Sequence, residues 1–406
     1  MGGETSEAPT ADEEFEERTL TDILDPRGFG WLTRLGLFGL LLLAVLPALQ
    51  GYGFLGIVVN STLLANITGA MFFAVFAMSW DMQSGYTGEI SFGHGLFFGV
   101  GGYASAILQA QMGLDLLVTI PLGMFAAGIA GLLIGFPSLR LQGPYFSLIT
   151  LVTPIIIIGL FRFAPDVTGG ATGLFTETLT TGAVEGYVVA LALFLGALVL
   201  FLAITRSDAG IVLTAIREDE LAVEAAGLNP AKFKLFSFVL SGLVGGLAGA
   251  LFVHTYAGGF VAPSDLLALV VSIEVIIASI IGGIGTITGA AIGGLFLFLF
   301  RVYIAQVDLT VPVIGVPIGE IYFLLFTVVT LVVLFFIPEG VITRILVRTR
   351  QRAAAREEED GGGGGGGPDL ATDGGWTEGE PSNLERIVAT FTEQLRAVLP
   401  GFGDDP

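Results

Sequence analysis

Long apolar stretches separated by short polar segments dominate the chain between Trp31 and Ile337. A helix needs about 20 mostly apolar residues to cross a bilayer, and most of these stretches are that long. The pattern predicts an all-α polytopic membrane protein with about ten transmembrane helices. The predicted spans are roughly Trp31–Gln50, Phe54–Met78, Phe92–Met112, Leu116–Pro137, Tyr145–Phe161, Tyr187–Ile204, Leu235–Tyr256, Leu266–Gly282, Ile287–Ile304 and Ile321–Ile337.

The stretch from Arg206 to Lys234 interrupts this pattern and is called the charged loop below. It carries nine charged side chains in 29 residues, so it must lie in water rather than in hydrocarbon. Its middle part has helical spacing of apolar residues, Gly227 is placed to end that helix, and Asn229 followed by Pro230 is placed to begin the next. The loop is therefore expected to fold, although a solvated connection without structure is the alternative.

The distribution of basic residues predicts the orientation of the chain. With ten spans and the N-terminus in the cytoplasm, 15 of the 17 basic residues fall on the cytoplasmic side, and Arg162 and Arg301 fall outside. We therefore expect both termini and the charged loop to be cytoplasmic, in a multi-pass protein of the plasma membrane.

The ends of the chain differ from its apolar part. The whole chain has a net charge of −20, and residues 1–30 with 351–406 hold 21 of the 37 acidic residues. We expect an acidic N-terminal tail (1–30) without a cleaved signal peptide, a membrane domain (31–343), a basic and then acidic, glycine-rich linker (344–381), and a tail with a short amphipathic helix (382–406). Such acidity argues against nucleic acid as a partner. With only two lysines, it suggests a halophilic source, and an ordinary disordered acidic tail is the alternative.

Two glycine-rich stretches, residues 79–106 and Ile281–Gly294, suggest either a translocation path or close helix packing. Non-helical backbone is tolerated in a membrane where it is buried in protein or lines water, and small residues let helices approach closely. Glu274, near the middle of a predicted span, should have a partner or be protonated, because a charge there is costly. The candidate residues are Gly85, Gly88, Ser91, Gly93, His94, Glu274, Gly282, Gly283 and Gly285.

Several kinds of chemistry have no motif in the chain. The sequence has no G-x-x-x-x-G-K-[ST] phosphate loop, no cysteine, and two histidines too far apart in sequence to suggest a metal site. An enzyme is therefore not expected. Three functions remain open from the residues alone: a transport subunit on which a soluble partner acts, an ion-coupled secondary transporter, and a structural membrane subunit.

Five motifs in order resemble one family. They are GYTGEISFGHGLFFGVGGYASA, LRLQGPYFSLITL, TGGATGL, SDAGIVLTAIREDELAVEAAGLNPAKFKLFSFVLSGLVGGLAGALF and SIEVIIASIIGGIGTITGAAIGG. Together they are similar to permeases of branched-chain amino-acid ABC importers, specifically the M-type permease subunit. The resemblance covers about Leu35 to Arg344 and leaves out the acidic tails.

This resemblance implies that the charged loop carries the degenerate "EAA" signature that docks on the ATPase. The implied coupling residues are Arg217, Glu218, Asp219, Glu220, Glu224, Ala225 and Gly227. Asp208 and Ile211 replace a proline and an arginine that are common in the family, and Gly227 follows Ala226 without the usual spacer.

The implied partners are a second, homologous permease, two cytoplasmic P-loop ATPases that bind the ATP, and an external substrate-binding protein. The implied substrates are leucine, isoleucine and valine, with no cofactor in this chain itself. Similar permeases import urea or short-chain amides, so that alternative stays open.

Overall fold

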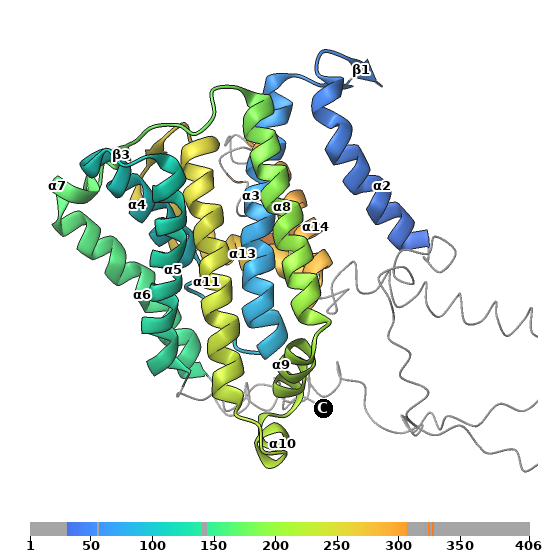
Figure 1. The fold of residues 1–406 in the computed structure, drawn as a ribbon, viewed down its shortest axis with the longest axis vertical. Helices are drawn as coiled ribbons and strands as arrows, with labels where there is room; N and C mark the ends of the chain where they lie inside the picture. The colour runs from blue at the N-terminus through green and yellow to red at the C-terminus, as the bar shows by residue number, and fades with distance from the viewer. Residues whose placement is uncertain are drawn as a thin grey trace, which may run out of the picture. The chain divides into compact units, whose positions relative to one another are not determined.

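The computed structural model describes residues 31–54, 57–139 and 144–306, together with residues 321, 324, 327 and 328. Over this part of the chain the structure is a bundle of long helices that run between two ends, with short helices and two-stranded hairpins at those ends (Figure 1). The predicted span Ile321–Ile337 lies almost entirely outside the described residues, as do the tails 1–30, 344–381 and 382–406.

The first half of the bundle is built from helices α2 to α7. Their bounds are α2 Trp31–Val45, α3 Ser61–Trp80, α4 Gly95–Met112, α5 Leu116–Ser138, α6 Pro144–Phe163 and α7 Pro165–Thr168. A 3-10 turn, Leu46–Leu49, follows α2, and a π-helical turn, Asp81–Gly85, extends α3.

The second half runs from α8 to α14. Its helices are α8 Ala183–Thr205, α9 Asp208–Glu218, α10 Glu220–Ala225, α11 Pro230–Thr255, α12 Pro263–Leu266, α13 Leu269–Gly282 and α14 Ile287–Ile304. Two small antiparallel sheets complete the described structure: β1 (Gly53–Phe54) with β2 (Ile57–Val58), and β3 (Leu174–Phe175) with β4 (Phe260–Val261).

Seven helices in the described residues are long and apolar enough to cross a membrane. They confirm a helical, multi-pass membrane protein, whereas the count of about ten spans stays a prediction. These spans are Ser61–Gly85, Leu116–Ser138, Tyr145–Phe163, Ala183–Thr205, Pro230–Thr255, Pro263–Gly282 and Ile287–Ile304.

Two predicted spans, Trp31–Gln50 and Phe92–Met112, are not among these seven. Helix α2 has 15 residues, and the 3-10 turn that follows it starts at Leu46. Helix α4 has 18 residues, but it is packed between α5 and α11, where most of its surface meets protein. A helix surrounded by protein in this way does not need an apolar surface of its own, which explains its higher polarity.

The second predicted span starts too early. Residues from Phe54 onward were expected to be helical, but the chain forms the β1–β2 hairpin first and α3 begins at Ser61. Asn60 fixes this start, because its side-chain oxygen accepts the backbone N–H of Leu63 at 2.8 Å.

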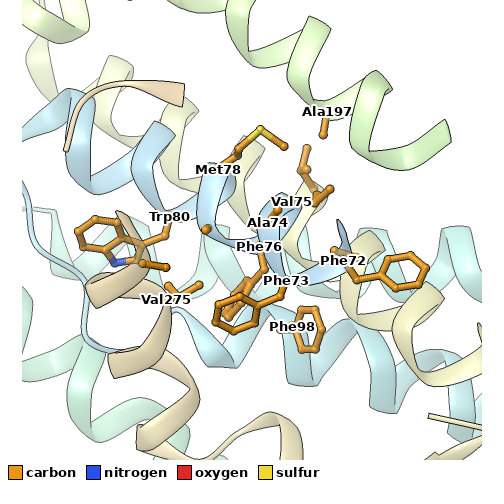
Figure 2. Packing of buried hydrophobic residues seen from close by; sticks show 14 of the residues in the cluster. Phe72, Phe73, Ala74, Val75, Phe76, Met78, Trp80, Phe98, Ala197 and Val275 are labelled. Atoms are coloured by element: carbon orange, nitrogen blue, oxygen red, sulfur yellow. The ribbon is translucent and has the colours of Figure 1, made fainter. Parts of the chain in front are cut away.

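Helix α3 is the centre of the bundle and packs against α8, α11, α13 and α14 (Figure 1). Every residue from Thr68 to Trp80 is buried, so the helix has no polar face. Figure 2 shows Phe72, Phe73 and Phe76 of α3 among residues of α4 and α13. A displacement of α3 would therefore also displace the helices that pack against it.

The two ends of the bundle carry different structures. Helices α9 and α10 of the charged loop lie at one end, and α7 with the β3 strand lies at the other (Figure 1). The long loop after α6 therefore faces away from the charged loop.

Candidate functional site

The charged loop is folded, but not as one helix. Helix α9 ends at Glu218 and α10 begins at Glu220, with the backbone of Asp219 extended between them. The Asp219 carboxylate accepts the backbone N–H of Ala222 at 3.1 Å and so caps α10. The prediction of a single helix across this segment is wrong, because an aspartate is more favourable at the N-cap of a helix than in its interior.

The end of α10 and the start of α11 are as the sequence predicts. Gly227 has φ +83°, and its N–H donates to the Glu224 carbonyl at 2.9 Å, while the Leu228 N–H donates to the Val223 carbonyl at 3.3 Å. These two bonds form a Schellman cap. Asn229 then caps α11, and Pro230 occupies its first turn.

One side of the charged loop faces away from the bundle. Leu213, Ile216 and Val223 are buried beneath it, whereas Leu221 is 72% exposed. The exposed positions also include the predicted coupling residues Glu218, Asp219, Glu224, Ala225 and Gly227.

The other two predicted coupling residues contact the membrane helices. They are Arg217, which is itself exposed, and Glu220, which is half-buried. Arg217 Nη1 donates to the carbonyl oxygen of Gly85 at 2.7 Å, at the end of the π-helical turn. Glu220 Oε2 lies 2.8 Å from Lys234 Nζ in α11. These contacts hold the loop at a fixed place on the bundle.

Lys234 is a central residue that the sequence analysis did not select. Its ammonium lies 2.8 Å from both Glu89 and Glu220, and its side chain is only 5% exposed. A buried lysine needs acidic partners. The rarity of lysine in this chain, which has only two, could have drawn attention to it. Its partner Glu89, however, lies 145 residues away in the sequence.

A junction forms where the charged loop meets the membrane helices, and it consists of the buried residues Asp81 and Gly85, half-buried Gly285 and exposed Arg217. Asp81 is fully buried, and its Oδ1 accepts the backbone N–H of Gly285 at 2.7 Å. A Cβ on Gly85 would lie 2.7 Å from the Gly285 nitrogen, so Gly85 has to be small, and Gly285 has φ +76°, which favours glycine. The two glycine-rich stretches of the sequence thus meet here, together with Gly88, which lies against the Arg217 side chain.

The remaining residues of the first glycine-rich stretch are packed in the interior. His94 is fully buried, its Nε2 lies 2.9 Å from Ser79 Oγ, and its ring stacks on Phe76. The Ser91 carbonyl accepts the indole N–H of Trp80 at 2.8 Å, and Gly93 packs tightly against the backbone of Thr150. These residues are packed inside the bundle, and whether they also border a translocation path stays a prediction.

Glu274 has the partner that its position requires. Its Oε2 lies 3.0 Å from Arg301 Nη1 of α14, and the Glu274 side chain is 4% exposed. Close contacts between Ala278 and Gly293, and between Gly282 and Gly289, continue the seam between α13 and α14. Gly283, with φ +115°, then ends α13.

Comparison with known proteins shows which family the chain is similar to. Residues 62–337 match the model of the family described as branched-chain amino acid transport system / permease component. The high-affinity branched-chain amino acid transport system permease protein LivM of Escherichia coli (strain K12) is 28% identical over 59% of this chain and 62% of its own length. No solved structure matches the chain.

Two further relatives are covered more fully. BraD of Pseudomonas aeruginosa is 28% identical over 60% of this chain and 86% of its own length. The probable permease LivM of Methanocaldococcus jannaschii is 24% identical over 66% of this chain and 89% of its own length. The family match covers more than half of the chain, which therefore belongs to the family of branched-chain amino-acid transport permease components.

Proposed function

We propose that this chain is a membrane-spanning subunit of an ATP-driven importer of branched-chain amino acids. The names of its relatives support the substrate class, because LivM and BraD are named as permeases of branched-chain amino-acid transport. Relatives named LivH also match, which supports a second, homologous permease as partner. In this proposal the charged loop is cytoplasmic, and ATP is bound by separate ATPase subunits rather than by this chain.

The observation that carries the proposal is the fixed fold of the charged loop. A partner can push on a membrane protein only through an element that is rigid and attached to the membrane helices. The loop meets both conditions, because α10 is capped at both ends and because Arg217 and Lys234 bind the loop to the end of α3 and to α11. Its exposed face, with Leu221, remains accessible to a partner.

An ion-coupled secondary transporter is the competing function. Such a transporter needs an ionisable group in the membrane that exchanges ions. Glu274 is the natural candidate, but its ion pair with Arg301 neutralises both charges, which favours a structural role. Import of urea or short-chain amides is a second alternative within the same family.

Co-purification tests the proposed assembly. We expect the tagged chain, extracted from native membranes, to bring with it a P-loop ATPase and a homologous permease. Leu221→Asp on the exposed face of the loop should remove the ATPase and leave the permease. Phe175→Asp is the matched control, because Phe175 is 75% exposed at the opposite end and should keep both partners.

Isolation of the chain without any ATPase would contradict the proposal. Equal loss of the ATPase in Leu221→Asp and Phe175→Asp would show that the charged loop is not the docking surface. Labelled leucine, urea and acetamide offered to the reconstituted complex then separate the substrate alternatives.

A further inference from the structure

The junction of Asp81, Gly85, Arg217 and Gly285 contains a buried carboxylate whose hydrogen bonding is incomplete. Asp81 is fully buried at the end of α3, and its Oδ1 is bound by the Gly285 amide. Its Oδ2 has no hydrogen-bond partner among the residues that the structure describes. A buried carboxylate is costly unless a positive charge lies close to it.

Arg217 of the charged loop lies close to this carboxylate, with Gly85 between them. Its Nη1 donates to the Gly85 carbonyl at 2.7 Å, and a Cβ on Gly85 would collide with the Asp81 carboxylate. A Cβ on Gly285 would collide with this same nitrogen. The two glycines therefore make the space in which the Arg217 side chain reaches the buried acid.

We propose that Asp81 is the positioning residue through which the charged loop acts on the membrane helices. Its carboxylate attracts Arg217 of α9 and holds the turn between α13 and α14 by the Gly285 amide. The inference rests on the proposed function, since it assigns the route by which the loop moves the permease.

The position of Asp81 in the bundle explains how the charged loop can act on helices that it does not contact. Asp81 follows directly on α3, whose last 13 residues are all buried against neighbouring helices. The π-helical turn that begins at Asp81 is a local irregularity of the kind often found at functional sites. Movement of α9 is thereby passed both to the central helix and to the start of α14.

Hydrogen–deuterium exchange on the full chain in lipid nanodiscs tests the link without relying on transport. The variants are Asp81→Asn, Arg217→Gln and the double variant, and the control is Arg206→Gln, an exposed arginine of the charged loop that is not among the predicted coupling residues. We expect either single variant to speed exchange in both segments 81–89 and 283–289. The double variant should do no more than the stronger single one, because both remove the same interaction.

A second readout distinguishes positioning from simple stability. In the assembled complex, Arg217→Gln should lower the amino acid imported per ATP hydrolysed by roughly fivefold or more. Arg217→Lys should keep most of this ratio, because it retains the charge near Asp81. If Asp81→Asn does not insert into the membrane, Arg217→Gln and Arg217→Lys still test whether the charge at position 217 is needed for coupling.

Three results would overturn the inference. They are exchange changes confined to the charged loop in Arg217→Gln, the same changes in Arg206→Gln, or equal loss of coupling in Arg217→Lys and Arg217→Gln. If instead the linkage is seen by exchange but the complex shows no ATP-driven uptake, the proposed function fails while the physical link stands.

Discussion

The ammonium of Lys234 lies 2.8 Å from a carboxylate oxygen of Glu89, although the two residues are 145 positions apart. Lys234 begins the second turn of α11, and Glu89 belongs to the irregular segment between α3 and α4. The same ammonium also binds Glu220 of α10. This one side chain therefore joins α11 both to α10 and to the segment between α3 and α4.

Replacing Lys234 should destabilise the protein. Lys234→Met removes two charge-assisted hydrogen bonds, and each such bond contributes about 1.5–3 kcal/mol when it is shielded from water. Glu220 is 39% exposed, so most of the loss should come from Glu89, at about 2 kcal/mol. We expect a lower Tm in detergent, measured by the change in intrinsic fluorescence.

Lys232→Met is the matched control for this change. Lys232 is the same residue type two positions earlier, but it is exposed. Its replacement should leave the Tm nearly unchanged. Equal effects of the two substitutions would show that the ion pairs of Lys234 do not stabilise the fold.

Gly227→Ala should weaken coupling through the backbone of the charged loop. Gly227 has φ +83°, and open space surrounds the position of a Cβ, so the expected cost of about 1 kcal/mol is conformational. The Schellman cap of α10 should loosen, and uptake per ATP should fall while the protein still inserts. Gly258→Ala carries the same strain at φ +65° in the opposite end of the bundle, and it should not reduce coupling. A similar fall in both variants would contradict a special role for the loop.

Gly293→Ala should disturb the seam between α13 and α14. The added methyl group collides with the backbone carbonyl of Ala278, which cannot move without shifting α13, so we expect a loss of about 1–3 kcal/mol in stability. Gly159→Ala in α6 is the control, because nothing lies near its Cβ position. That change should be neutral or stabilising by up to about 1 kcal/mol, since alanine favours helix. Thermal unfolding of the two variants side by side is the measurement.

Single cysteines test the orientation, because the chain contains none of its own. Asp166 of α7 and Glu218 of α9 are both exposed and lie at opposite ends of the bundle. A membrane-impermeant thiol reagent added to intact cells should label Asp166→Cys and spare Glu218→Cys. Labelling of Glu218→Cys alone would reverse the proposed topology.

Local signals in the sequence were enough for several parts of the structure. The apolar stretches located the seven helices that are long enough to cross a membrane, and Gly227, Asn229 and Pro230 located the boundary between α10 and α11. Each of these depends on neighbours within a few residues. The early start expected for the second span was wrong because an apolar hairpin and an apolar helix look alike without periodicity.

The parts that sequence reasoning missed depend on distant contacts. Asp81 was not selected because its importance depends on its hydrogen bond with the Gly285 amide, 204 residues further along the chain. Lys234 was seen as one of two lysines, but nothing local shows that it faces Glu89. Glu274 was recognised as needing a partner, yet the choice of Arg301 follows from how α13 packs against α14.

The energy source of uptake tests the central proposal most directly. The chain should be reconstituted with its co-purified ATPases, homologous permease and binding protein, and import of labelled leucine followed with Glu274→Gln as the companion variant. We predict uptake that requires ATP and persists when proton and sodium gradients are collapsed, in the unaltered chain and in Glu274→Gln alike. Uptake driven by a gradient through this chain alone, and lost in Glu274→Gln, would contradict the account.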